Sequence, residues 1–121
     1  MGVCMKAADI IARRFGVSTW ARQNPLTSTV GTSVSRVLDN NPGRLAWTIV
    51  NLSPNNVYLA LDRGVGATHG ILLTPNGGSA SMMLDEDYEA TCWEMFGVAS
   101  ADNSDIFVIE VLIEKEVSVY R

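Results

Sequence analysis

The chain has 121 residues, of which 47% are hydrophobic and 18% charged, as expected for one globular domain that buries a core without disulfides or metal. No apolar run approaches the roughly 18–20 residues of a membrane-spanning helix, and the first 14 residues lack the apolar core of a secretory signal. We therefore expect a reducing cytoplasm as the place of synthesis and no membrane partner. Cys4 and Cys92 are expected to be free thiols, with a disulfide between them as the alternative.

Charge is unevenly distributed along the chain. Residues 1–44 carry six basic and two acidic side chains, a net charge of +4, whereas residues 45–121 carry three basic and eleven acidic ones, a net charge of −8. Such asymmetry is typical of a segment that interacts with a partner, and chance in a short chain is the alternative. The acidic part would repel phosphates, so nucleic acid is not an expected partner.

The first predicted element is a helix that ends near residue 15. Its apolar stripe recurs at helical spacing and consists of Met5, Ala8, Ile11, Ala12 and Phe15. Gly16 stands where a C-terminal cap belongs, and Arg13 and Arg14 in the last turn favour the helix dipole. A helix this short is marginal alone in water, so its stripe needs a surface to pack on.

An extended arm is expected after the helix, through residue 40. It is rich in Ser, Thr, Asn and Arg, and residues 29–38 fit either a first strand or a helical turn. Trp20 stands beside Arg22 in a polar stretch with no evident strand of its own, and tryptophan is prominent among interface hot spots. The candidate interface residues are therefore Ile11, Arg13, Arg14, Phe15, Trp20 and Arg22.

From Arg44 onward the pattern is one of short strands separated by turn signals. Strands are expected over residues 45–51, 57–61, 71–74, 79–84, 91–99 and 106–113, with 114–120 as a continuation or an edge strand. The Pro54–Asn56 turn predicts a hairpin between the first two, residues 85–87 an acidic bend, and Gly97 a bulge. Six or seven strands favour a small antiparallel β-sandwich or barrel. The expected organisation is a helix and extended arm over 1–40 and a β-sandwich body over 41–121.

Several segments of this body carry a recognisable pattern. They are NPGRLAWTIVNLS at 41–53, YLAL at 58–61, GILLTPNGGS at 70–79 and FVIEV at 107–111. Together they resemble small β-sandwich structural proteins of tailed bacteriophage particles. In those proteins an N-x-x-R start leads into a strand that ends in x-N-x-S, and a v-Y-l strand, a G-i-x-L-x-P-G-G-S segment and a C-terminal v-x-V-x-E strand follow. The resemblance covers roughly residues 40–112.

Motifs for catalysis or metal binding are not recognised. The loop Gly64-x-Gly66-x-x-x-Gly70 lacks the Lys-Ser/Thr of a P-loop, and His69 has no nucleophile at motif spacing. The acidic residues 85–87 lack the spacing of a calcium loop. Trp47 and Trp93 fall within predicted strands and are expected to pack in the core. We therefore expect no enzyme, no cofactor and no metal.

The resemblance implies a virion structural protein, either a capsid decoration or cement subunit or another head-associated subunit. Its location would be the virion after synthesis in the host cytoplasm, and its partners would be copies of itself and a major capsid or other virion protein. The alternatives are a head–tail or fibre-base component and a carbohydrate- or small-ligand-binding β module.

Overall fold

In the computed structural model, which describes residues 6–116, the chain forms nine strands, one helix of two and a half turns and two short helical segments. In chain order these are α1 (Ala7–Phe15), β1 (Val17–Gln23), β2 (Thr29–Val30), β3 (Ser35–Leu38), β4 (Arg44–Asn51), β5 (Val57–Ala60), β6 (Ile71–Leu73), β7 (Ser79–Met83), α2 (Leu84–Asp87), the 3₁₀ helix η1 (Tyr88–Cys92), β8 (Met95–Ala99) and β9 (Ser104–Glu116).

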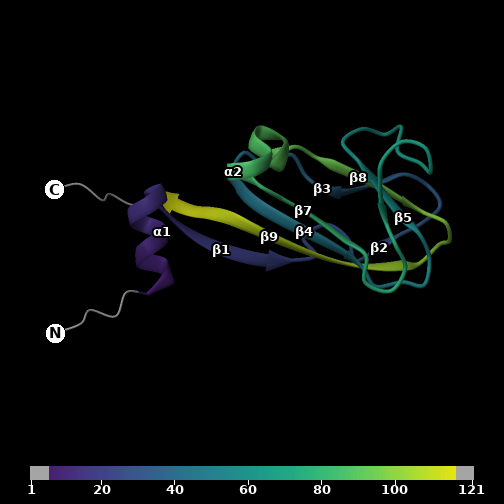
Figure 1. Cartoon of the computed structure of the whole chain (residues 1–121), viewed down its shortest axis with the longest axis horizontal. Coiled ribbons are helices and arrows are strands. Elements are labelled where there is room, and N and C mark those ends of the chain that lie inside the picture. Colours follow the sequence, from purple (N-terminus) through teal and green to yellow (C-terminus); the bar gives the residue numbers. More distant parts are fainter. Residues whose placement is uncertain (1–5, 117–121) are drawn as a thin grey trace.

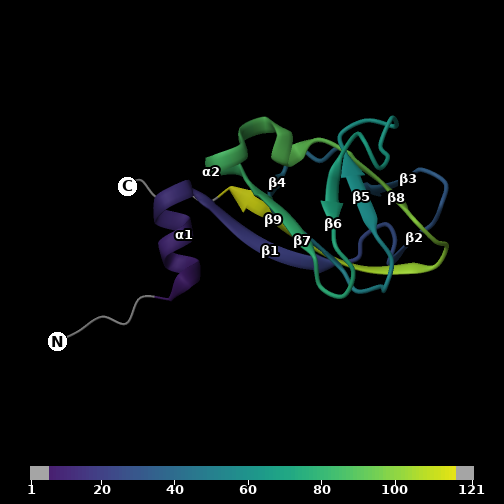
Figure 2. The same cartoon turned by 45° about the vertical axis from the view of Figure 1, so that its right-hand side comes forward.

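The strands form two antiparallel sheets. The first, here called the long sheet, has the order β1-β9-β4-β7, and β2 also pairs with β9. The second, here called the short sheet, has the order β3-β8-β5-β6. β1 and β9 run past the short sheet toward α1 (Figure 1), while β5 and β6 come forward at the opposite end of the molecule (Figure 2). The predicted mostly-β fold is confirmed.

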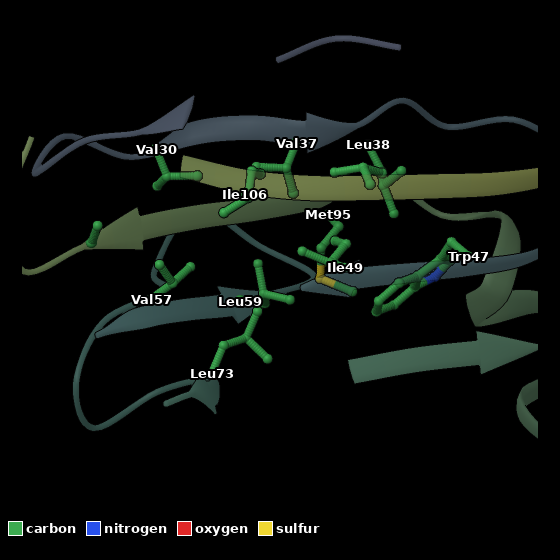
Figure 3. Packing of buried hydrophobic residues seen from close by; sticks show 12 residues of the cluster. Val30, Val37, Leu38, Trp47, Ile49, Val57, Leu59, Leu73, Met95 and Ile106 are labelled. Atoms are coloured by element: carbon green, nitrogen blue, oxygen red, sulfur yellow. The ribbon is translucent and has the colours of Figure 1, made fainter. Parts of the chain in front are cut away.

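The core lies between the two sheets and takes apolar side chains from both (Figure 3). The long sheet contributes Val30, Trp47, Ile49, Ile106 and Val108, and the short sheet contributes Val37, Leu38, Val57, Leu59, Leu73, Met95 and Ala99. Alternate residues of β4 and β9 point inward, as the two-residue period of a strand requires. A packed layer between two sheets is the arrangement of a β-sandwich.

The expected hairpin between residues 45–51 and 57–61 is wrong. β4 pairs with β7 and β9, whereas β5 pairs with β6 and β8, so the turn carries the chain from one sheet to the other. Asn51 holds this crossing: it is fully buried, and its Nδ2 donates to the carbonyl oxygens of Asn55 (2.6 Å) and Leu73 (3.0 Å). The sequence correctly predicted a turn after β4, but the side-chain amide of Asn51 ties this turn to β6 of the short sheet.

The extended arm expected through residue 40 is wrong, whereas the strand alternative for residues 29–38 is borne out by β2 and β3. β1, β2 and β3 pair with β9 and β8, so residues 17–38 belong to the two sheets rather than to an arm that leaves the body. Trp20 accordingly lies within β1. The predicted bulge is on the neighbouring strand, because the register shifts between Arg36 and Leu38 of β3, opposite the strand that contains Gly97.

The N-terminal helix is confirmed, and it ends as predicted. Gly16 is in the left-handed region (φ 71°) and donates its N–H to the carbonyl of Ala12 at 2.8 Å. The helix contacts β1 but buries none of its residues fully. Within residues 6–116 no helix has the length and apolar character needed to cross a membrane.

The remaining differences lie around the acidic bend and the last strand. The bend is helical, with α2 followed directly by η1, so the strand expected over 91–99 begins only at Met95. At the C-terminal end, the strand expected over 106–113 extends in β9 from Ser104 to Glu116, and residues 117–120 lie outside the described residues.

Candidate functional site

An open apolar groove of about 270 Å³ lies on the face of the long sheet that points away from the core. Its wall on one side is α1, its opposite wall is the junction of β7 and α2, and β1, β4 and β9 form its floor. The residues that line it are Ile11, Phe15, Thr19, Leu45, Ala46, Met83, Leu84, Asp85 and Val111. Only Thr19 and Asp85 among them are polar, so the groove offers an apolar contact with few hydrogen-bonding groups.

The helix presents two of the predicted interface residues to this groove. Ile11 and Phe15 are four residues apart and therefore share one face of α1. The side chain of Phe15 remains 48% exposed, and across the groove Met83 is 50% and Leu84 38% exposed. Large apolar side chains that line one groove and remain this exposed are typical of a surface that contacts another molecule.

The two walls carry opposite charges. Arg13 and Arg14 are exposed in the last turn of α1, and the guanidinium of Arg14 lies 5.2 Å from the centre of its neighbour's ring, that of Phe15. The opposite wall carries Asp85 and Glu86 in the first turn of α2, and both residues are also exposed. Charged side chains therefore flank the apolar groove, basic ones on α1 and acidic ones on α2.

The other two predicted interface residues do not belong to the groove. Trp20 follows Thr19 in β1 and so points to the opposite face of the sheet. It is 44% exposed, and the guanidinium of Arg22 lies 5.8 Å from its ring centre. Arg22 also donates to Glu110 at 2.9 Å. These two residues therefore border the polar end of the core rather than the groove.

A buried ion pair lies at that end of the core. Glu110 of β9 and Arg44 of β4 are both fully buried, and Nε of Arg44 donates to Oε2 of Glu110 at 2.6 Å. The remaining guanidinium nitrogens donate to the carbonyl oxygens of Asp39 (2.7 Å), Trp93 (3.2 Å) and Thr91 (3.3 Å). Each nitrogen of the Arg44 guanidinium thus has a partner, and the group ties the long sheet to η1 and to the end of β3.

The glycine-rich loop, residues 64–70, is held by contacts of its own backbone and by a contact between His69 and Asp62. His69 Nε2 lies 3.1 Å from Oδ1 of Asp62, and Gly66 and His69 form an isolated β-bridge. Hydrogen bonds from the backbone N–H of Gly64 and from the His69 ring lower the pKa of Asp62 below its ordinary value of 3.8. Both side chains border a second hollow of about 330 Å³ whose other lining residues are apolar or glycine. Ser, Thr, Cys and Lys side chains are not among the residues that line this hollow.

The aromatic and cysteine residues divide between core and surface. Trp47 is 1% exposed, as expected, but Trp93 follows η1 rather than lying in a strand and is 48% exposed. The Cys92 thiol is free and lies 3.1 Å from the carbonyl oxygen of Arg44, and Cys4 lies outside the described residues. Over the described part of the chain, no three His, Cys, Asp or Glu residues gather in a way that could hold a metal ion.

Sequence reasoning missed the floor and the second wall of the groove. Leu45, Ala46 and Val111 look like ordinary strand residues, and nothing in their spacing connects them with residues 11–19. The sequence offers one signal, the apolar run Met82-Met83-Leu84 directly before three acids. Successive residues of a strand point to opposite faces, so the three side chains of this run cannot all point into the same core.

Comparisons with family models, with curated proteins and with solved structures found no match.

Proposed function

We propose that this chain is a structural subunit that works by binding other proteins, with copies of itself among them, and that it carries out no chemical reaction. The observation that carries the proposal is the apolar groove between α1 and α2. Its residues come from six elements, α1, β1, β4, β7, α2 and β9, and yet Phe15 and Met83 are each about half exposed. A shaped apolar surface of this kind is stabilised when another protein covers it.

The composition of the groove favours a protein surface over a carbohydrate. A sugar presents hydroxyl groups on most of its surface, and each of them must find a hydrogen-bonding partner when it leaves water. The groove provides only the side chains of Thr19 and Asp85 for this purpose. Aliphatic and aromatic side chains of another protein fit the remaining lining better.

We further propose that the subunit belongs to the particle of a tailed phage, as a capsid decoration, cement or other head-associated protein. Support for this comes from the resemblance of residues 40–112 to such proteins. A head–tail or fibre-base position is the alternative placement on the same particle. All of these roles require a stable scaffold with an exposed contact surface, and none requires a catalytic residue.

Immunogold electron microscopy tests the placement on a particle. Antibodies raised against the purified chain would be applied to particles purified from cells that carry the gene. Labelling of the head is the expected result, and labelling at the neck or fibre base selects the alternative position. If the chain stays in the cell lysate and particles carry no label, the proposal of a virion protein is wrong.

A further inference from the structure

We propose that the groove is the contact between two copies of this chain, related by a two-fold axis, and that α1 of each copy lies against the groove of the other. The inference rests on the proposed function only in assuming self-association. It commits to a second copy because the two walls of the groove carry complementary charges on the same chain.

Charge complementarity is the first step. The last turn of α1 carries the exposed Arg13 and Arg14, and the first turn of α2 carries the exposed Asp85 and Glu86. In a two-fold contact the same patch serves on both sides, so a residue pair formed in one direction forms again in the other. A basic wall that meets the partner's acidic wall therefore produces two identical sets of opposite charges, and the like-charged walls stay apart.

The distribution of side chains around α1 gives the second step. Ile11 and Phe15 face the groove, while Arg13 is two residues from each and so projects from the opposite side of the helix. If α1 of the partner lies in the gap between α1 and α2, the two copies of Ile11 and Phe15 meet at the axis. Arg13 of each copy then faces α2 of the other.

The resulting interface has a defined order. Four helical segments, α2, the partner's α1, α1 and the partner's α2, lie in one layer between the two long sheets. Phe15, Met83 and Leu84, which are 48%, 50% and 38% exposed in the single chain, are covered in this layer. Protein interfaces usually have apolar side chains at the centre and charged side chains at the rim, as this layer does.

Charge reversal tests this arrangement, because only a contact that pairs α1 of one copy with α2 of another responds to both variants and to their mixture, and the size of the restored complex distinguishes a closed dimer from a longer head-to-tail assembly. The first variant carries Arg13→Glu and Arg14→Glu, and the second carries Asp85→Lys and Glu86→Lys. Each variant alone brings like charges together at both ends of the interface, and we expect its dimer dissociation constant to rise about tenfold or more. An equimolar mixture of the two restores opposite charges at both ends, so a heterodimer of near wild-type stability should form.

Sedimentation equilibrium of the full chain over a wide concentration range measures these constants, and circular dichroism verifies that each variant is folded. Met83→Glu should also abolish the dimer, and Leu72→Ala, which alters a 49% exposed residue of the short sheet, should leave it unchanged. A wild-type chain that remains monomeric overturns the proposal in favour of a partner of different sequence. Variants that dimerise like the wild type, or a mixture that fails to associate, overturn it as well, because the copies then do not pair α1 with α2.

These outcomes are distinguishable from the fate of the proposed function. Particles that carry the chain while the charge-reversal variants still self-associate would refute the groove contact and leave the virion role intact. A dimer that responds to charge reversal, with no label on any particle, would refute the virion role and retain the groove contact.

Discussion

Arg44 and Glu110 form an ion pair in which both side chains are completely buried, with Nε and Oε2 only 2.6 Å apart. Removal of two charges from water is unfavourable, and their mutual attraction offsets this only when the remaining polar atoms are also satisfied. Here they are satisfied: Glu110 receives a second hydrogen bond from Arg22, and Arg44 donates to three backbone carbonyls. The pair therefore fixes how the end of the long sheet meets η1.

Replacement of Arg44 by methionine should lower the free energy of unfolding by about 3–5 kcal/mol, because Glu110 then stays buried beside a single, partly exposed arginine. Urea unfolding monitored by circular dichroism measures the change. Arg22→Met is the matched control: its side chain is 33% exposed, so we expect a loss of about 1 kcal/mol. Equal losses for the two variants would contradict the assignment of the buried pair as the principal contact.

Gly78→Ala should disrupt the turn between β6 and β7. A Cβ atom at this position would lie 2.3 Å from the backbone nitrogen and 2.5 Å from the carbonyl oxygen of Thr74, and neither atom can move independently of the turn. We expect a loss of about 1–3 kcal/mol or more in unfolding experiments. Gly66→Ala serves as the control, since a Cβ there meets no atom within 4 Å, and it should change stability by less than about 0.5 kcal/mol. A neutral Gly78→Ala would show that the turn is looser than described.

Asp102 should make stability depend on pH below its ordinary pKa of 3.8. Its Oδ1 accepts hydrogen bonds from the backbone N–H of Thr32 at 2.8 Å and from the Thr32 hydroxyl at 3.0 Å, and these lower the pKa of the folded state. The stabilisation is therefore fully present above the unfolded pKa and is lost as the pH falls through the folded pKa. We expect the difference in Tm between wild type and Asp102→Asn to be constant above pH 3.8 and to shrink below it. An NMR titration that places Asp102 at or above 3.8 would argue against this link.

Two deletions should separate the helix from the strand that follows it. Removal of residues 1–15 takes away α1, which has no buried residue, and should leave a folded body that no longer dimerises. Removal of residues 1–24 also takes away β1, which pairs with β9 from Val17 to Gln23, and should lower the Tm substantially or prevent folding. Thermal unfolding and sedimentation of both chains provide the comparison. Loss of folding on removal of residues 1–15 alone would show that α1 is part of the core.

The sequence predicted best what local chemistry determines. Gly16 marked the end of α1, because only a residue without a Cβ takes the left-handed conformation easily. The inward alternation in β9 was visible in Ile106, Val108 and Glu110, although the burial of a carboxylate required a partner that no spacing identified. Arg44, 66 residues earlier, is that partner. Its N-x-x-R context was noticed, but its ion pair depends on the register between β4 and β9.

The features that the sequence did not predict depend on contacts between residues far apart in the chain. β1 was not recognised as a strand because its outward residues, such as Ala21 and Gln23, and its inward residues, such as Arg22, do not alternate between polar and apolar. The expected hairpin failed because a turn signal shows where the chain reverses and not which sheet the next strand joins. The groove could not be predicted, because its residues come from positions 11 to 111 and meet only after both sheets have formed.

The position of β9 within the long sheet has a consequence for the order in which the protein is made. β1, β2 and β4 all pair with β9, and all three leave the ribosome before it. Until β9 emerges, these strands have unpaired edges, and Arg44 has no carboxylate beside it. Folding of the long sheet is thus a late event in the life of the nascent chain, and the exposed edges of this interval are where premature association between neighbouring chains on one messenger RNA would begin.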